Sequence, residues 1–299
     1  MTSPSVGIVI RTKDRPGLLR RALGSVTGQT FPDWDCVIVN DGGDPAPVDA
    51  LAAEFGVEGR SIRVIHHDAA RGRWKSANAG VLALATPLLV LHDDDDSWHP
   101  GFLTRATEYL RDNPERDGVV SRIEIVWERP SDAGFEAVGR EIFQPDLADL
   151  LLSDALLFNR YVPIAFVYRR SLHEELGLYD DSLPVIGDWA FNLRVLARGP
   201  LEFLPGPPLA YWHQRVGVDG SAGNSVIAAR DVHAKHDALI RDAALREYVD
   251  QNGLGLVLYL TKFIDKRFVD VETGIRREIV EASFWHRAKD KARRTLRRR

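Results

Sequence analysis

The first part of the chain alternates two apolar patterns, and this alternation most constrains its fold. Short segments in which nearly every residue is apolar are typical of strands buried on both faces of a sheet. Between them, apolar residues recur every three or four positions, as on one face of a helix. This order indicates an α/β fold with a mostly parallel sheet that has helices on both faces. The strands are predicted at residues 6–11, 36–39, 62–65 and 88–92, and the helices at 15–26, 48–55 and 76–85.

The pattern changes after residue 114, where β-branched and aromatic residues become frequent. We expect a strand at 119–127 and a return strand at 135–138, joined by a turn rich in Pro, Ser and Gly. From about residue 227 onward the chain is predicted to be helical. The elements predicted in between are helices at 147–152, 171–176 and 188–197, a strand at 162–168 and an interrupted strand at 201–212.

Polar residues gather where each of the predicted parallel strands ends. The carboxyl ends of parallel strands meet at one edge of a sheet, and ligands bind outside that edge. We therefore expect the four polar clusters to converge on a single ligand site. They are residues 12–14, 40–44, 66–73 and 93–96.

The last of these clusters is a run of four aspartates, Asp93 to Asp96, directly behind a buried strand. Two carboxylates about 4 Å apart repel by roughly 4 kcal/mol at an effective dielectric constant near 20, so the run needs a counter-charge. A bound cation is the simplest one, and oxygen ligands favour Mg²⁺ or Mn²⁺ shared with substrate phosphates. The alternative is a solvated acidic loop in which Asp96 or Ser97 caps a helix that begins near Pro100.

Composition narrows the class of protein. The chain has 299 residues, 44% hydrophobic and 27% charged, as in soluble globular proteins, and its net charge of −4 argues against nucleic-acid binding. The single cysteine, Cys36, cannot form an internal disulfide, which suits a reducing compartment. The N-terminal residues lack a signal-peptide pattern, and no apolar run approaches the ~18 residues that span a bilayer. We therefore expect a cytoplasmic protein.

The strand ends lack the glycine-rich motifs of several nucleotide-binding enzymes. No Gly-x-Gly-x-x-Gly follows the first strand and no Gly-Lys-Ser/Thr phosphate loop is present, which argues against dinucleotide oxidoreductases and P-loop NTPases. Arg-Thr-Lys-Asp, at 11–14, stands where a phosphatase would carry an Asp-x-Asp nucleophile. A nucleotidyltransferase would carry a glycine-rich loop at the same place.

Six segments in order resemble family 2 glycosyltransferases of the GT-A fold, over roughly residues 5–215. The resemblance implies a Rossmann-like GT-A domain at 1–225, with a nucleotide-binding half at 1–115 and an acceptor-side half at 116–225. A helical extension with a basic tail would follow at 226–299. The matching segments are VIRTKDRP (9–16), VIVNDGGD (37–44), RGRWKSANAG (71–80), LHDDDDSWHP (91–100), YRRSLHEELGLYD (168–180) and LPVIGDWAFNLR (183–194).

The resemblance implies a nucleotide-diphosphate sugar as the donor, with a UDP-sugar as the favoured class. Asp41 stands where the second-strand aspartate of the family contacts the nucleobase, with Thr12 beside it. Arg71, Lys75 and Asn78 lie in the segment that the family places near the base and the diphosphate. An Asx turn with the following glycines is the alternative for Asp41, and a solvated helix start is the alternative for the two basic residues.

The resemblance also implies an Asp-x-Asp motif formed by Asp93 and Asp95. Asp95 is expected to bind the metal, Mn²⁺ or Mg²⁺, while Asp93 or Asp94 faces the ribose or a metal-bound water. The cation would neutralise the donor diphosphate and so stabilise the leaving group. His213 lies in a segment whose basic residues, in the family, reach the diphosphate or the metal. It is a candidate third ligand, with a buried structural histidine as the alternative.

Asp188 is the predicted catalytic base. The family commonly carries Glu-Asp here, whereas this chain carries Gly187-Asp188. The carboxylate would take the proton from an acceptor hydroxyl as that oxygen attacks the anomeric carbon, and a single displacement inverts the anomeric configuration. Helix capping is the alternative role for Asp188. We expect the missing acid at 187 to alter acceptor choice rather than to abolish the chemistry.

We therefore expect a metal-dependent, inverting glycosyltransferase whose acceptor is a glycan or a lipid-linked saccharide. The tail from Trp285 to Arg299 has eight Lys or Arg and one acid, so it could hold an anionic membrane from the cytoplasmic side or be a solvated terminus. One alternative function is a nucleotidyltransferase-type nucleotide-sugar enzyme. The other is a catalytically silent nucleotide-sugar- or glycan-binding protein, suggested by Gly187 and Asn40, where many relatives carry acids.

Overall fold

The computed structural model of the chain describes residues 5–56, 60–132, 134–215, 217–218 and 230–296. It contains two compact units, Met1–Asp237 and Ala238–Arg299. Both sheets belong to the first unit, and the second consists of helices. The predicted domain boundary after residue 225 lies outside the described residues and stays a prediction.

The larger sheet has seven strands in the order β10-β6-β9-β4-β1-β2-β3. Its parallel core is formed by β1 (Val6–Thr12), β2 (Trp34–Asn40), β3 (Ser61–His66) and β4 (Leu88–Asp93). One strand, β9 (Phe166–Arg169), runs antiparallel to both of its neighbours, β4 and β6. The predicted, mostly parallel α/β sheet is therefore confirmed. The two short strands at its edge are β6 (Gly118–Val120) and β10 (Glu202–Phe203).

The register of the parallel strands brings their carboxyl ends to one edge. Thr12 pairs with Asn40, and Asn40 pairs with His66 on the next strand. On the other side of β1, Arg11 pairs with Asp93. The predicted polar clusters therefore do converge at this edge, because each begins where its strand ends.

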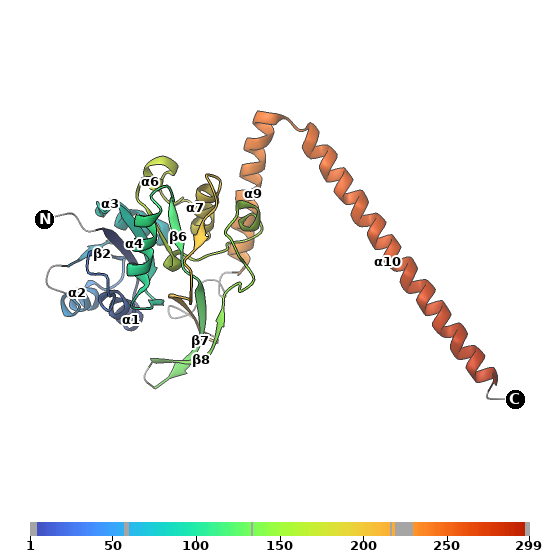
Figure 1. The fold of residues 1–299 in the computed structure, drawn as a ribbon, viewed down its shortest axis with the longest axis horizontal. Coiled ribbons are helices and arrows are strands. Elements are labelled where there is room, and N and C mark those ends of the chain that lie inside the picture. Colours follow the sequence, from blue (N-terminus) through green and yellow to red (C-terminus); the bar gives the residue numbers. More distant parts are fainter. Residues whose placement is uncertain (1–4, 57–59, 133, 216, 219–229, 297–299) are drawn as a thin grey trace. The chain divides into compact units, whose positions relative to one another are not determined.

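Helices cover both faces of these strands. α1 (Pro16–Thr27) and α2 (Pro45–Glu54) pack against each other on one face, and α3 (Arg73–Ala83) packs against β1 and β2 on the other (Figure 1). α1 and α2 both have proline in their first turn, where the missing backbone N–H is not needed. Asp44 caps α2 by accepting a hydrogen bond from the Ala46 amide at 3.1 Å.

A second sheet of four strands, in the order β5-β11-β7-β8, continues from the aspartate run. β5 (Ser97–Trp98) follows the run directly and leads into α4 (Phe102–Asp112). β7 (Ile123–Ser131) and β8 (Gly134–Ile142) form an antiparallel hairpin, visible at the lower side of Figure 1. β11 (Ala210–Arg215) lies between β5 and β7, so a late segment returns to the neighbourhood of the aspartates.

The predicted helix near 147–152 is wrong. A short helix, α5 (Leu152–Ala155), begins only where the predicted one should end. Leu150 is instead fully buried and forms an isolated bridge with Leu201. The apolar residues of this segment face the core through a tertiary contact rather than through helical periodicity.

The predicted strand at 162–168 is correct only in its second half. It begins as a 3₁₀ helix (Pro163–Ala165), because Pro163 has no N–H to donate to a sheet ladder, and becomes β9 at Phe166. α6 (Ser171–Leu176) and α7 (Gly187–Leu196) form where helices were predicted.

The described part of the chain from residue 230 onward is almost entirely helical, as predicted. α9 (Arg230–Asn252) begins in the first unit, and α10 (Gly255–Leu296) belongs to the second. Gly253, with a φ of 75°, lies between the two helices in a conformation that favours glycine. Within the described ranges, no helix combines the length and the apolar character needed to cross a bilayer.

Candidate active site

The four aspartates at the end of β4 alternate between the interior and the site. Asp94 and Asp96 are buried, with 0% and 2% exposure. The side chains of Asp93 and Asp95 keep 31% and 15% exposure. The two acids assigned to the Asp-x-Asp motif are therefore the two that a ligand can reach. Asp94, predicted to face the donor, has no exposed surface to offer it.

Arginine side chains supply the counter-charge for this run. Arg11 pairs with Asp93, and Arg215 pairs with Asp95. Arg15 binds Asp94 through both ends of its guanidinium group, with its Nε 3.1 Å from Oδ2, and its Nη1 lies 3.5 Å from Asp95. Repulsion among the carboxylates therefore does not by itself require a metal ion.

Asp96 joins the two sheets. Its carboxylate accepts a hydrogen bond from the backbone N–H of His213 on β11 at 2.9 Å. The alternative in which Asp96 or Ser97 caps the following helix is wrong, since Gly101 precedes α4 and no side chain caps it. Burial raises the pKa of Asp96 well above its ordinary value, and the charges of Asp95 and Asp93 add to this effect.

The exposed Asp93 and the buried Asp94 differ in proton affinity. Burial would raise the pKa of Asp93, but the cations of Arg11, Arg73 and Arg15 outweigh it and hold that pKa below its ordinary value. Asp94 behaves in the opposite way, since burial, with a further contribution from Asp95, raises its pKa to about 7 against the effect of Arg15. The exposed Asp93 is therefore the more acidic of these two neighbours.

A buried polar cluster that the sequence reasoning missed lies between β11 and β7. His213 approaches Glu128 Oε1 through Nδ1 at 2.7 Å and the Ser97 hydroxyl through Nε2 at 2.8 Å. Arg21 from α1 also pairs with Glu128, at 2.6 Å. Burial lowers the pKa of His213, although Glu128 opposes the shift, so the imidazole is held neutral.

The position of His213 favours its structural alternative. Both of its ring nitrogens have partners, so binding a metal would require one of these hydrogen bonds to break. Over the described ranges, no three His, Cys, Asp or Glu side chains come together as a ready metal centre. A site made of one or two carboxylates, completed by substrate phosphates, remains compatible with this geometry.

Asp188 lies in the first turn of α7, where it joins the same polar region. Asn159 donates a hydrogen bond from Nδ2 to Asp188 Oδ2 at 2.8 Å. Burial raises the pKa of Asp188, whereas the cations of Arg11 and Arg73 lower it and the charge of Asp93 raises it. The fold thus brings Asp188 and Asp93 within electrostatic reach of one another. The residue that precedes α7 is Ile186, so Asp188 is not its N-cap.

The residues predicted to bind the donor fall into two groups. The Asp41 carboxylate accepts hydrogen bonds from His67 Nδ1 at 3.0 Å, from the backbone amides of residues 71 and 72 at 2.8 and 3.0 Å, and from the Ser76 side chain. Asn78 binds the backbone of Tyr179 in both directions, at 2.9 and 3.1 Å. These side chains hold the loop before α3. The Asx-turn alternative for Asp41 is wrong, because its carboxylate binds this loop, whereas the Gly42 and Gly43 amides bind Asn40.

The remaining predicted donor residues differ in exposure. The side chains of Arg71 and Lys75 are exposed beside the strand edge. The hydroxyl of Thr12 is buried and donates to Asp94. Arg11, Arg15, Arg73, Arg215 and Glu128 were not among the predicted site residues, although Arg11 and Arg15 flank the first polar cluster.

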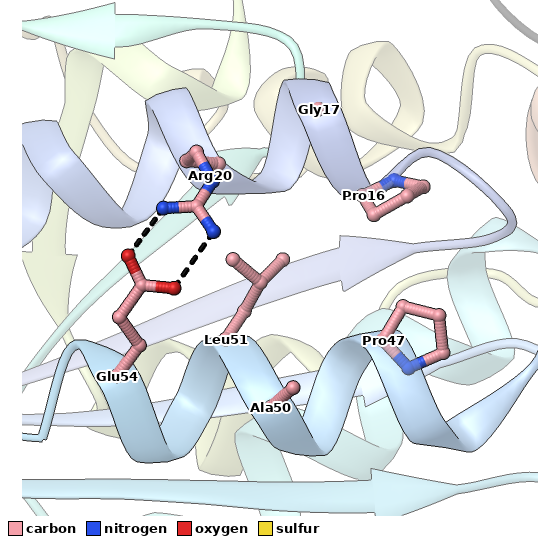
Figure 2. A pocket seen from close by; sticks show the side chains of 7 residues that line it. All are labelled: Pro16, Gly17, Arg20, Pro47, Ala50, Leu51 and Glu54. Atoms are coloured by element: carbon pink, nitrogen blue, oxygen red, sulfur yellow. Dashed lines mark hydrogen bonds and ion pairs between the residues drawn. The ribbon is translucent and has the colours of Figure 1, made fainter.

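One surface pocket, of about 270 Å³, lies apart from these groups, between α1 and α2 (Figure 2). Its rim carries an ion pair between Arg20 and Glu54, with Arg20 Nη2 2.7 Å from Oε2. The other lining residues are Pro16, Gly17, Pro47, Ala50 and Leu51. The pocket contains none of the predicted site residues and has few groups that could bind a diphosphate.

A sequence model of the family described as glycosyl transferase family 2 matches residues 7–177. The chain belongs to glycosyl transferase family 2. A relative of this family 2 glycosyltransferase, the uncharacterized glycosyltransferase YwdF of Bacillus subtilis, is 32% identical over 218 residues, 73% of this chain and 77% of the relative. A PGL/p-HBAD biosynthesis glycosyltransferase of Mycobacterium bovis is 29% identical over 203 residues, 67% of this chain and 73% of the relative.

Solved structures show the same fold. S. aureus TarS 1-349 in complex with UDP-GlcNAc has a TM-score of 0.57 and 15% identity, covering 84% of the family 2 chain and 75% of TarS 1-349. The mannosyltransferase PcManGT of Pyrobaculum calidifontis, in complex with GDP-Man and Mn²⁺, has a TM-score of 0.59 and 19% identity, covering 82% of this chain and 65% of PcManGT. The expected GT-A fold is thereby confirmed.

Proposed function

We propose that this glycosyltransferase moves a sugar from a nucleotide-diphosphate donor to an acceptor hydroxyl, with inversion at the anomeric carbon. One observation carries the proposal. Asp93 and Asp188 come from distant parts of the chain and interact with the same two cations, those of Arg11 and Arg73. A diphosphate bound by these cations beside Asp93 would have its sugar near Asp188.

Asp188 is the proposed base. Its carboxylate takes the proton of the acceptor hydroxyl while that oxygen bonds to the anomeric carbon, and the bond from this carbon to the diphosphate oxygen breaks. Burial raises the pKa of Asp188, which strengthens a carboxylate as a proton acceptor. Asn159, through its 2.8 Å hydrogen bond, and the backbone N–H of Trp189 orient this carboxylate for the acceptor.

Arg11 and Arg73 are the proposed ligands of the donor diphosphate, and the exposed acids would hold a metal ion beside it. Asp93 and Asp95 fit a Mn²⁺ or Mg²⁺ ion in chemistry, because both offer partly exposed carboxylate oxygens. When bound, such an ion would neutralise charge on the departing diphosphate. PcManGT, a solved structure with the same fold, contains Mn²⁺ in its complex. His213, with both nitrogens engaged, would be a ligand only after a rearrangement.

A UDP-sugar is the donor that we propose first, because TarS was solved with UDP-GlcNAc, and a GDP-sugar is the second choice, because PcManGT was solved with GDP-Man. The exposed Arg71 and Lys75 are placed to contact the nucleotide. Thr12, Asp41 and Asn78 would act mainly by shaping the loop that holds it, since their polar groups already have partners.

The proposed acceptor is a glycan or a lipid-linked saccharide, reached at the cytoplasmic face of a membrane. The basic sequence Trp285 to Arg299 supplies the charge for an anionic surface. Of the exposed large apolar side chains of α10, eight fall mainly at spacings of three and four, as in helices that lie in a membrane interface. They are Leu256, Leu260, Phe263, Ile264, Phe268, Val271, Ile275 and Ile279.

The direct test is to incubate the purified chain with UDP- and GDP-sugars, with and without Mn²⁺, and to identify the released nucleotide. The proposal predicts slow release of nucleoside diphosphate with water as acceptor, faster when Mn²⁺ is present. Pyrophosphate release would instead indicate a nucleotidyltransferase-type enzyme. Donor binding without any turnover would indicate a silent binding protein.

A further inference from the structure

Trp74 and Gly187 are in unusually close contact. Trp74 is the second residue of α3 and is 3% exposed, and Gly187 is the first residue of α7. A Cβ atom on residue 187 would lie 2.7 Å from Cε2 and Nε1 of the indole and 2.8 Å from Cδ2. No side chain fits at 187 while the indole stays where it is. The acid that family members commonly carry there is therefore replaced by the face of a tryptophan from another helix.

The same indole also contacts the donor side of the site. The guanidinium carbon of Arg11 lies 4.9 Å from the centroid of the Trp74 ring, within the range of a cation–π interaction. Arg11 in turn pairs with Asp93. Trp74 thus touches the residue next to Asp188 and the cation bound to Asp93.

Trp74 is firmly held from its own side. Its ring stacks on Tyr179 with centroids 5.3 Å apart and an angle of 28° between the planes. Asn78, one turn further along α3, binds the backbone of Tyr179 through two hydrogen bonds. The indole is therefore a fixed surface against which the start of α7 packs.

This arrangement has local costs. Ile186, just before Gly187, adopts φ 54° and ψ 16°, a left-handed conformation that is a genuine outlier for a β-branched residue. The indole N–H of Trp74 is buried and, within the described part of the chain, has no hydrogen-bond partner. Both features are unfavourable for stability, and such strain concentrates at functional sites. Asp188 is the functional group that follows directly.

We propose that Trp74 is a positioning residue for the transfer reaction. Packed on Gly187, it fixes the first turn of α7 and so sets where the Asp188 carboxylate stands relative to the Arg11–Asp93 pair. The inference rests on the proposed role of Asp188 as the base. It also explains why residue 187 is glycine rather than the acid that the family commonly carries, because only glycine leaves room for the indole.

The test is a double-mutant cycle on turnover and donor affinity. Gly187→Ala should lower kcat for nucleoside diphosphate release about 10- to 100-fold, the size expected of a misplaced catalytic group, and leave the donor Kd within about twofold. In a Trp74→Leu background, the same glycine change should cost less than about threefold. Gly199→Ala is the matched control, because a Cβ there meets nothing within 4 Å. If the leucine background does not fold, Trp74→Phe replaces it.

The outcomes separate this inference from the function on which it rests. Equal losses of kcat from Gly187→Ala in both backgrounds would overturn the positioning role while leaving the proposed function intact. A loss of donor affinity as large as the loss of kcat would overturn it as well, because it would indicate a general disturbance of the fold. A wild-type chain that releases no nucleoside diphosphate from any donor would overturn both.

Discussion

Arg215, on β11, pairs with Asp95, which lies 120 positions earlier in the turn after β4. The Arg215 side chain is fully buried, and its Nη1 is also 4.0 Å from Glu128. A carboxylate that was expected to hold a metal therefore already has a cation. Metal binding to Asp95 must compete with this guanidinium group, so the donor and the metal are expected to bind together rather than separately.

Arg215→Met should expose this competition. Without the guanidinium, Asp95 is available to the ion, and we expect Mn²⁺ to bind the nucleotide-free protein about tenfold more tightly, or about 1.4 kcal/mol. Arg15 still lies 3.5 Å from Asp95, and Arg21 and His213 still pair with Glu128, so losing the Arg215 hydrogen bond should cost only about 1.5–3 kcal/mol of unfolding free energy. Calorimetry with Mn²⁺ and denaturant unfolding measure the two effects, and Arg111→Met, at an exposed arginine, is the control. An unchanged Mn²⁺ affinity would contradict the competition.

Asp95→Ala should remove the effect of Mn²⁺ on nucleotide binding. Asp95 is one of the two acids of the run with an exposed side chain, so its loss leaves Asp93 as the sole exposed carboxylate of the run. We expect the UDP affinity measured with Mn²⁺ to fall about tenfold or more, to the value measured without it. Asp112→Ala, at an exposed acid, should bind as the wild type does. The metal role of Asp95 fails if Mn²⁺ still strengthens binding in its absence.

The pKa of Asp94, raised to about 7, predicts a pH dependence of stability. Because the pKa of this carboxyl is about 3.9 in an unfolded chain, the folded state binds the extra proton between these values. Its contribution to stability is full below about pH 4 and is lost as the pH rises through 7. Asp94→Asn imitates the protonated form. The Tm of this variant minus the Tm of the wild type should therefore increase as the pH rises from about 4 to 7. A constant difference in Tm would contradict the raised pKa.

Arg73→Gln should change the pH dependence of turnover. Arg73 lowers the pKa of Asp188, so removing its charge raises that pKa further. The base must be ionised, so turnover falls as the pH drops through this pKa, and in the variant the fall should begin at a higher pH. Rates of nucleoside diphosphate release across pH give the two profiles, with Arg111→Gln as the control. Superimposed acidic limbs would show that Arg73 does not act on the base.

The α/β sheet could be predicted because its four parallel strands are continuous apolar runs, and their order fixes which ends meet. One error came from a segment whose conformation depends on a distant partner. Leu150 is buried against Leu201, and no local periodicity in the sequence signals that bridge. The 3₁₀ turn at Pro163 was predictable from the proline, which cannot donate to a sheet ladder.

The candidate site was only half visible in the sequence. The aspartate run was conspicuous, and the exposed positions of Asp93 and Asp95 agree with the motif assigned to them. The sequence did not identify the arginine partners of the run, because Arg15 and Arg215 are 79 and 120 positions away from the aspartates that they bind. The contact between Trp74 and Gly187 was equally hidden, since it depends on how closely two helices approach. Sequence patterns identify charged side chains, whereas the tertiary structure determines which of them form ion pairs.

The measurement that tests the central claim most directly is turnover by Asp188→Asn at saturating donor. Asparagine keeps the shape of the side chain and cannot accept the acceptor proton. Nucleoside diphosphate release should therefore fall about 10²- to 10⁴-fold, while the donor Kd from calorimetry stays within about twofold. Asp181 is an exposed acid between α6 and α7, and the control variant Asp181→Asn should release nucleoside diphosphate at the wild-type rate. Turnover by Asp188→Asn at the wild-type rate would contradict the account.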